Sequence, residues 1–160
     1  MKKRVVFLTM IVVGALLLWR ILVFTTFEKA VADQLNEDTV IESITISLYQ
    51  FPEGYQERKA VTTIEDEELI RIILEDFSDL KLKKIERPKN INMKYSLSII
   101  TTNEVAENHL STEKLYLRFD ENFITISNGY YQHFEIVNDT DHLKTIKSLI
   151  ENEKIEWENY

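Results

Sequence analysis

Cysteine is absent from this chain of 160 residues, and glycine and proline are scarce, with three and two copies. Without cysteine the chain has no disulfide bond, no thiolate metal ligand, no thiol nucleophile and no cysteine to carry a lipid. Three glycines are too few to build a glycine-rich phosphate-binding loop. With 44% hydrophobic residues, however, the chain is neither disordered nor fibrous. Its stability must therefore come from an apolar core.

Catalytic motifs are missing as well. No serine lies in a Gly-x-Ser-x-Gly sequence, and the histidines His109, His133 and His142 are never four residues apart. Folding could bring His133 and His142 together, with Asp139 or Asp141 adding a carboxylate for metal binding or acid–base chemistry. A hydrolase or metal enzyme using this pair is the least favoured hypothesis, because surface or capping histidines explain the pattern more simply. We expect no cofactor and no enzymatic activity.

Positive charge is scarce beyond the start of the chain. The whole sequence carries a net charge of −8, and the first 27 residues contribute +4, so residues 28–160 carry −12. The phosphates of nucleic acids repel an acidic domain of this kind. We therefore expect no nucleic-acid partner.

The chain begins with a cationic cluster followed by a long apolar run. The cluster is Lys2, Lys3 and Arg4, and the run Val5–Phe27 carries a single charge, Arg20. As one helix, this run would span about 34 Å, enough for the hydrocarbon core of a bilayer of about 30 Å. The sequence therefore predicts a transmembrane helix, with the lipid bilayer as its first partner.

The flanking charges predict how this helix is oriented. Lys2, Lys3 and Arg4 favour the cytoplasmic side, which places the C-terminal domain outside the cell as part of a single-pass membrane protein. Trp19 and Arg20 then fall near the outer interface, where indole rings are common and the stem of an arginine reaches the headgroups. These five residues are the predicted membrane-interface residues.

A cleaved signal peptide is the alternative to a retained anchor. Val5–Trp19 has the length of a signal's apolar run, and Ala30-Val31-Ala32 resembles a cleavage site, with the cut after Ala32. Cleavage there would release a secreted domain. Because the site lies far from the first apolar run, a retained anchor is favoured. The predicted division is an anchor over 1–27, a juxtamembrane stalk over 28–40 and an extracytoplasmic domain over 41–160.

The extracytoplasmic domain shows strand and helix periodicities. Helical spacing predicts a helix over Ile64–Phe77 capped by Thr63, and a second that carries Leu143 and ends near Glu153. Alternation of apolar and polar residues predicts strands over Ile41–Phe51, Leu80–Ile85, Met93–Ile99, Leu115–Phe119, Phe123–Ile126 and Tyr130–Ile136. The predicted fold is α+β: an N-terminal transmembrane helix, then an antiparallel sheet of about five or six strands with two helices packed on one face.

Two connections have distinctive compositions. Asn128-Gly129 is the dipeptide typical of a type I′ hairpin turn, because both central residues of that turn need positive φ. The polar segment Thr102–Thr112 is expected to be a loop.

Two groups of residues are candidates for partner contact. One is a basic stretch in an otherwise acidic domain, and the other is a tyrosine pair; Tyr49, Phe51 and Tyr55 also gather near the end of the first strand. The candidate residues are Lys81, Lys83, Lys84, Arg87, Lys89, Tyr130 and Tyr131. The basic stretch could contact an envelope protein or an anionic wall polymer. The preferred interpretation is that its lysines protect an edge strand from pairing with another chain. The tyrosines suit an interface or cover a half-buried sheet surface.

The layout of residues 41–152 resembles small secreted or membrane-tethered α+β domains of unknown function from Gram-positive bacteria. The likeness consists of the opening strand Ile44-Thr45-Ile46, the acidic helix start at Thr63 and the hairpins that follow. Many such domains carry a lipid-attachment cysteine, which this chain lacks. The resemblance implies no catalytic residues.

Two functional hypotheses lead from these observations. The first is a membrane-anchored extracytoplasmic module that binds or interacts with another protein and has no catalytic chemistry. The second is a small-ligand-binding domain with its pocket between the sheet and the first helix, secreted after cleavage.

Overall fold

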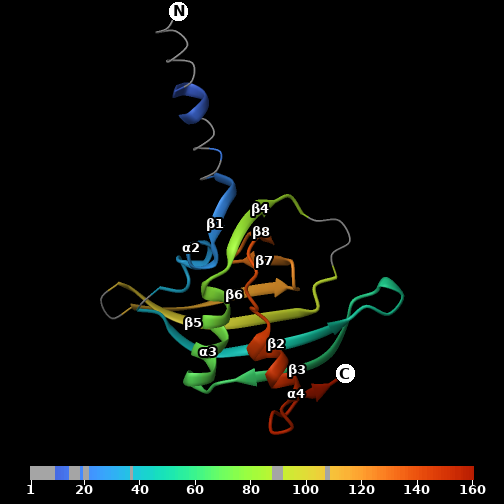
Figure 1. Cartoon of the computed structure of the whole chain (residues 1–160). Coiled ribbons are helices and arrows are strands. Elements are labelled where there is room, and N and C mark those ends of the chain that lie inside the picture. Colours follow the sequence, from blue (N-terminus) through green and yellow to red (C-terminus); the bar gives the residue numbers. More distant parts are fainter. Residues whose placement is uncertain (1–9, 15–18, 20–21, 37, 88–91, 107–108) are drawn as a thin grey trace, which may run out of the picture.

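The computed structural model describes residues 10–14, 19, 22–36, 38–87, 92–106 and 109–160. Within these residues, nine strands form one antiparallel sheet (Figure 1). The strands are β1 Phe24–Thr26, β2 Val40–Gln50, β3 Glu57–Ile64, β4 Lys81–Ile85, β5 Tyr95–Ala106, β6 His109–Phe119, β7 Phe123–Ser127, β8 Tyr131–Ile136 and β9 Glu158–Asn159. Their order across the sheet is β1-β4-β8-β7-β6-β5-β2-β3-β9, so the outermost strands have three and two residues.

The helices are short and lie together on one side of the sheet. They are α2 Phe27–Val31, α3 Glu67–Ser78 and α4 Lys144–Glu151, with the 3-10 helix η1 Pro52–Gly54 in the β2–β3 hairpin. Figure 1 shows α3 and α4 crossing the same face of the sheet, with α2 beside it. The opposite face carries none of the described α-helices, and we call it the open face.

The helix α3 is fixed by its cap and by its apolar stripe. The side chain of Asp66 accepts a hydrogen bond of 2.8 Å from the backbone N–H of Leu69, which satisfies one of the free donors of the first turn. The predicted cap, Thr63, belongs instead to β3. Ile70, Ile73 and Phe77 share one face of α3 and are buried against the sheet.

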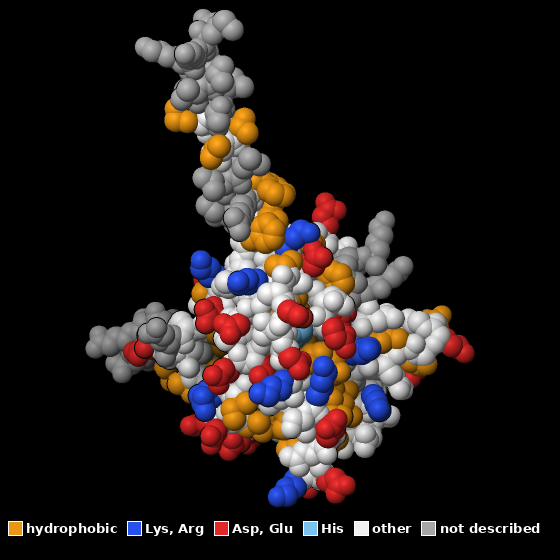
Figure 2. Space-filling model, in the orientation of Figure 1, with side chains coloured by type: hydrophobic (Ala, Val, Ile, Leu, Met, Phe, Trp, Pro, Cys, Tyr) orange, Lys and Arg blue, Asp and Glu red, His pale blue; other side chains and the backbone are white. Residues whose placement is uncertain are grey.

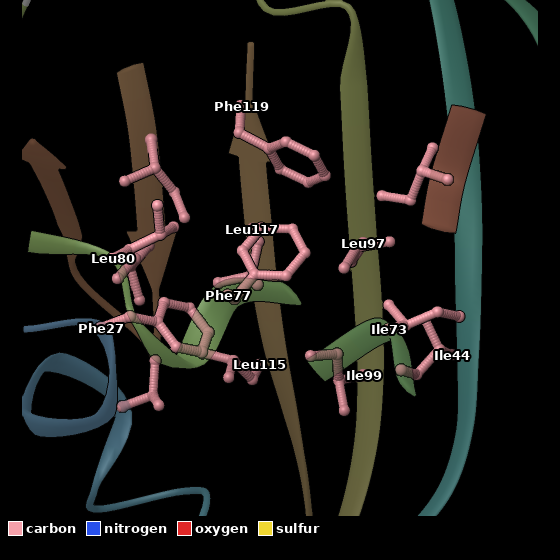
Figure 3. Packing of buried hydrophobic residues seen from close by; sticks show 14 of the residues in the cluster. Phe27, Ile44, Ile73, Phe77, Leu80, Leu97, Ile99, Leu115, Leu117 and Phe119 are labelled. Atoms are coloured by element: carbon pink, nitrogen blue, oxygen red, sulfur yellow. The ribbon is translucent and has the colours of Figure 1, made fainter. Parts of the chain in front are cut away.

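The strands present alternate residues to the helices (Figure 3). In β5 and β6, Leu97 lies opposite Leu117 and Ile99 lies opposite Leu115, and all four side chains are fully buried. Because successive strand residues point to opposite faces, the residues between them lie on the open face. The core is therefore a layer between the sheet and the helices.

Aromatic contacts tie the helix layer to the sheet. The ring of Phe77 lies 5.5 Å from that of Phe27, 5.0 Å from that of Phe119 and 5.7 Å from that of His142, measured between centroids. Nε2 of His142 is also 2.8 Å from the carbonyl oxygen of Asp120. Figure 3 shows Phe77 pointing from α3 into the cluster that contains Phe27, Leu117 and Phe119.

The predicted fold class is wrong. Over the described residues, the chain folds mainly as one nine-stranded antiparallel sheet with short helices, rather than as an α+β domain with five or six strands. Strand β3 lies in a segment that has few large apolar residues, and only Ala60, Thr62 and Ile64 face inward from it. The polar segment Thr102–Thr112 forms the outer arms of β5 and β6 instead of a long loop.

The prediction of a transmembrane helix is also wrong. Among the described residues, no helix combines the length and the hydropathy that crossing a bilayer requires. Phe24–Thr26 forms β1 and pairs with β4, while Phe27 and Val31 are buried in the core. The end of the predicted anchor and the start of the predicted stalk therefore pack into the domain. The predicted single-pass membrane location depended on this helix, so the structure does not support it.

The β7–β8 turn differs from the type I′ prediction. Ser127 pairs with Tyr131, so the connection has three residues, 128–130, rather than two. Only Gly129 of the predicted dipeptide has a positive φ, at 102°. A three-residue loop needs one left-handed residue, and glycine supplies it.

Candidate functional site

The clearest hollow in the described structure is a groove of about 620 Å³ between α2 and α3. Phe27, Val31 and Ile70 form its floor and are at most 3% exposed. Leu35 and Leu74 form half-buried walls. Asn36 and Thr39, in the chain that follows α2, also line the groove.

The segment that follows α2 is held in place by hydrogen bonds. The Thr39 hydroxyl donates to Oδ1 of Asn103 at 2.6 Å and accepts from the backbone N–H of Asn36 at 2.9 Å. Backbone N–H groups of Gln34 and Leu35 donate to the Val31 carbonyl at 2.9 and 2.8 Å. One side of the groove is therefore tied to β5 and has a defined shape.

The rim of the groove is acidic. Glu28, Glu67 and Glu75 line it together with one arginine, Arg71. Arg71 Nη1 lies 3.5 Å from Oε2 of Glu75, in an exposed pair one helical turn apart. This pair neutralises one carboxylate, so Glu28 and Glu67 leave a negative rim around an apolar floor.

The basic stretch does not form one patch. β4 pairs with β1 on one side and with β8 on the other, so the edge-strand interpretation is wrong over Lys81–Lys83. Lys83 Nζ forms an ion pair of 2.8 Å with Glu135. Register places Lys84 on the other face from Lys83, and Arg87 is exposed beyond the strand. Lys89 lies outside the described residues.

The other predicted residues are dispersed. Tyr130 and Tyr131 are 82% and 69% exposed, at and just after the β7–β8 turn. Trp19 is 60% exposed. The remaining membrane-interface residues, Lys2, Lys3, Arg4 and Arg20, lie outside the described residues.

The structure does not bring His133 and His142 together. His142 is 2% exposed on the helix side, where it packs against Phe77. His133 lies on the open face, and its Nδ1 is 2.9 Å from the Thr125 hydroxyl. Burial, and then the charge of Arg87, lower the pKa of His133 below its ordinary value of 6.5. No set of three or more His, Asp or Glu side chains among the described residues is placed to hold a metal ion.

Sequence reasoning missed the side of the groove that α2 forms, although a signal was present. Phe27, Val31 and Leu35 are spaced four apart, which is the spacing of one helical face. The assignment of Phe27 to a membrane anchor hid this pattern. The predicted pocket between the sheet and the first helix is close to the observed groove, which also contacts Ile41 of β2.

Comparisons with family models, curated proteins and solved structures found no match to this chain. The resemblance to small Gram-positive α+β domains therefore stays a prediction.

Proposed function

We propose that this domain is a binding module that holds a small amphipathic ligand in the groove between α2 and α3. The observation that supports the proposal is the groove of about 620 Å³ with a buried apolar floor. Ligand pockets of about 300–1,000 Å³ with mainly apolar linings are typical of small-molecule sites. The acidic rim formed by Glu28 and Glu67 favours a ligand with an apolar body and a cationic head.

A fluorescent apolar probe tests the groove directly. The neutral dye N-phenyl-1-naphthylamine should brighten when it enters, and decylamine should displace it at a lower concentration than decanoate does. The preference follows from the charge of the rim, because an amine head is attracted where a carboxylate is repelled. Equal displacement by the two competitors would contradict the cationic head, and no dye binding would contradict the groove as a site.

Two variants on one helix separate the groove from general surface binding. Leu74→Trp fills the groove and should weaken dye binding by about tenfold or more, a loss of about 1.4 kcal/mol. Ile72→Trp adds the same ring to α3 at a position that is 37% exposed and outside the groove, and it should bind like the unmodified protein. If both variants bind the dye equally well, the groove is not the site.

A further inference from the structure

The open face carries a group of residues that the groove does not use. We call Tyr49, Arg58, Ser96, Tyr116 and Arg118 the tyrosine–arginine cluster. They come from four adjacent strands, β3, β2, β5 and β6. Register pairs Arg58 directly with Tyr49, and it pairs Ser96 directly with Arg118. Tyr116 is two residues from Arg118 on β6, so the two side chains share a face.

Each arginine of the cluster stacks on a tyrosine ring. The Arg118 guanidinium carbon lies 5.8 Å from the centroid of Tyr49, and that of Arg58 lies 5.5 Å from the centroid of Tyr160. Arg118 Nη2 also donates a hydrogen bond of 2.8 Å to Oε1 of Gln56. These contacts hold the two guanidinium groups in defined positions without neutralising them.

Neither cluster arginine pairs with a carboxylate in the part of the chain that the structure describes. Other basic residues do: Arg71 pairs with Glu75 and Lys83 pairs with Glu135. Nε of Arg118 is buried and has no hydrogen-bond partner among the described residues.

The cluster also stabilises negative charge on a phenol. Burial raises the pKa of Tyr49, but hydrogen bonding with Ser96, Tyr116 and Arg58, together with the charge of Arg58, brings it below the ordinary value of 10.0. Burial raises the pKa of the neighbouring Tyr116. An environment that favours a phenolate over a phenol also favours a bound oxyanion.

We propose that the tyrosine–arginine cluster is a binding site for an oxyanion, the carboxylate or phosphate group of a ligand. Guanidinium groups bind both kinds of oxyanion through parallel N–H donors, and the tyrosine and serine hydroxyls add neutral donors at the same place. The site lies on the opposite face of the sheet from the groove and does not depend on the function proposed for the groove.

Titration by NMR tests the site with two defined probes. Inorganic phosphate and citrate should each shift the backbone amide signals of residues 47–49, 57–59, 96 and 116–118 in a saturable manner. Sodium chloride at matched ionic strength should not. The probe with the tighter saturation identifies whether phosphate or carboxylate is the preferred group. Shifts that are no larger than those with sodium chloride would overturn the proposal.

Variants locate the binding. Arg58→Gln combined with Arg118→Gln should abolish saturation, and each single variant should weaken it by about tenfold. Arg71→Gln is the matched control, because it removes an exposed arginine on α3 and should leave binding unchanged. If the double variant saturates like the unmodified protein, the cluster is not the site.

The Tyr49 phenol gives a second readout that a purely structural role would not move. A bound oxyanion adds negative charge beside the phenol, so phosphate or citrate should raise the pKa of Tyr49. Absorbance at the phenolate band, taken as the difference between the unmodified protein and Tyr49→Phe, follows Tyr49 together with the Tyr116 phenol with which it interacts. An unchanged pKa in saturating probe would contradict binding beside Tyr49.

Discussion

The two faces of the sheet are built from the same strands but have different chemistry. On the covered face, Leu97 and Leu117 pack under α3 and are fully buried. On the open face, one residue away along the same strands, Ser96 lies opposite Arg118. The difference teaches that strand alternation places apolar residues on one face for the core and leaves the other face free to carry polar and charged side chains.

Charge separates the faces further. The side that carries the helices shows acidic and basic side chains scattered over its surface, with apolar patches between them (Figure 2). The open face concentrates two arginines and two tyrosines in one cluster. Substitutions matched across the sheet can therefore test whether the covered face supplies the stability.

The largest effect is expected from the centre of the covered face. Phe77→Ala removes a fully buried ring that contacts Phe27, Phe119 and His142, and it should lower the free energy of unfolding by about 3–5 kcal/mol. Tyr131→Ala, on the open face, should change it by less than about 0.5 kcal/mol. Urea denaturation followed by tryptophan fluorescence measures both. Similar losses at the two positions would contradict the assignment of stability to the covered face.

The same threonine substitution should have opposite signs on the two faces. Thr101, on the covered face, is fully buried, and its hydroxyl has no hydrogen-bond partner among the described residues. Thr101→Val should therefore raise the free energy of unfolding by about 1 kcal/mol. The hydroxyl of Thr125, on the open face, is 2.9 Å from Nδ1 of His133. Thr125→Val should lower the free energy by about 1 kcal/mol.

Urea denaturation of the two valine variants checks the signs. A lower free energy of unfolding for Thr101→Val, or a higher one for Thr125→Val, would show that hydrogen bonding of the threonine hydroxyls does not determine the change in stability.

A smaller effect is expected from the ion pair between β4 and β8. Lys83 and Glu135 are directly opposite in the register, and both side chains are 40% exposed. A double-mutant cycle with Lys83→Met and Glu135→Gln should give a coupling energy of about 0.5 kcal/mol, falling as salt is added. A coupling energy that does not respond to salt would exclude a screened surface pair.

The smallest effect is a pH dependence from the open face. The pKa of His133 is lower in the folded protein than the value of 6.5 for the free side chain, so the unfolded chain takes up the proton first on acidification. Stability present above pH 6.5 should therefore fall as the pH drops below it. His133→Gln should lose less stability than the unmodified protein between about pH 7.5 and about pH 5.5. Equal losses of stability in the variant and the unmodified protein would mean that His133 does not contribute to the pH dependence.

Local periodicity predicts some elements of this fold and misses others. Ile44, Ile46 and Leu48 alternate with polar residues and correctly place β2, and the stripe ending at Phe77 correctly places α3. The outer arms of β5 and β6 show no alternation of apolar and polar residues, because polar residues such as Thr102 and Glu113 occupy both of their faces. Periodicity therefore does not predict them as strands. In these arms, pairing with the neighbouring strand replaces burial as the source of order.

The candidate sites depend on contacts that no local pattern contains. The sequence predicts a pocket between the sheet and the first helix but not the contribution of α2, because Phe27 continues the apolar run of the predicted membrane segment. Tyr49 stood out as part of an aromatic group, but its partner Arg118 lies 69 positions further along the chain, and only strand pairing brings the two together. Register over long sequence separations is set by the whole sheet, so it cannot be deduced from one segment at a time.

The brevity of the outermost strands has a consequence for association between molecules. A sheet border with many free N–H and C=O groups acts as a template to which a second chain can add. At one border β9 shields Ala60 and Val61, and the Tyr160 N–H donates to the Lys59 carbonyl at 3.1 Å. Deleting residues 158–160 should free the backbone groups of Lys59, Ala60 and Val61 and so lengthen the unpaired border of β3 to which a second chain can add.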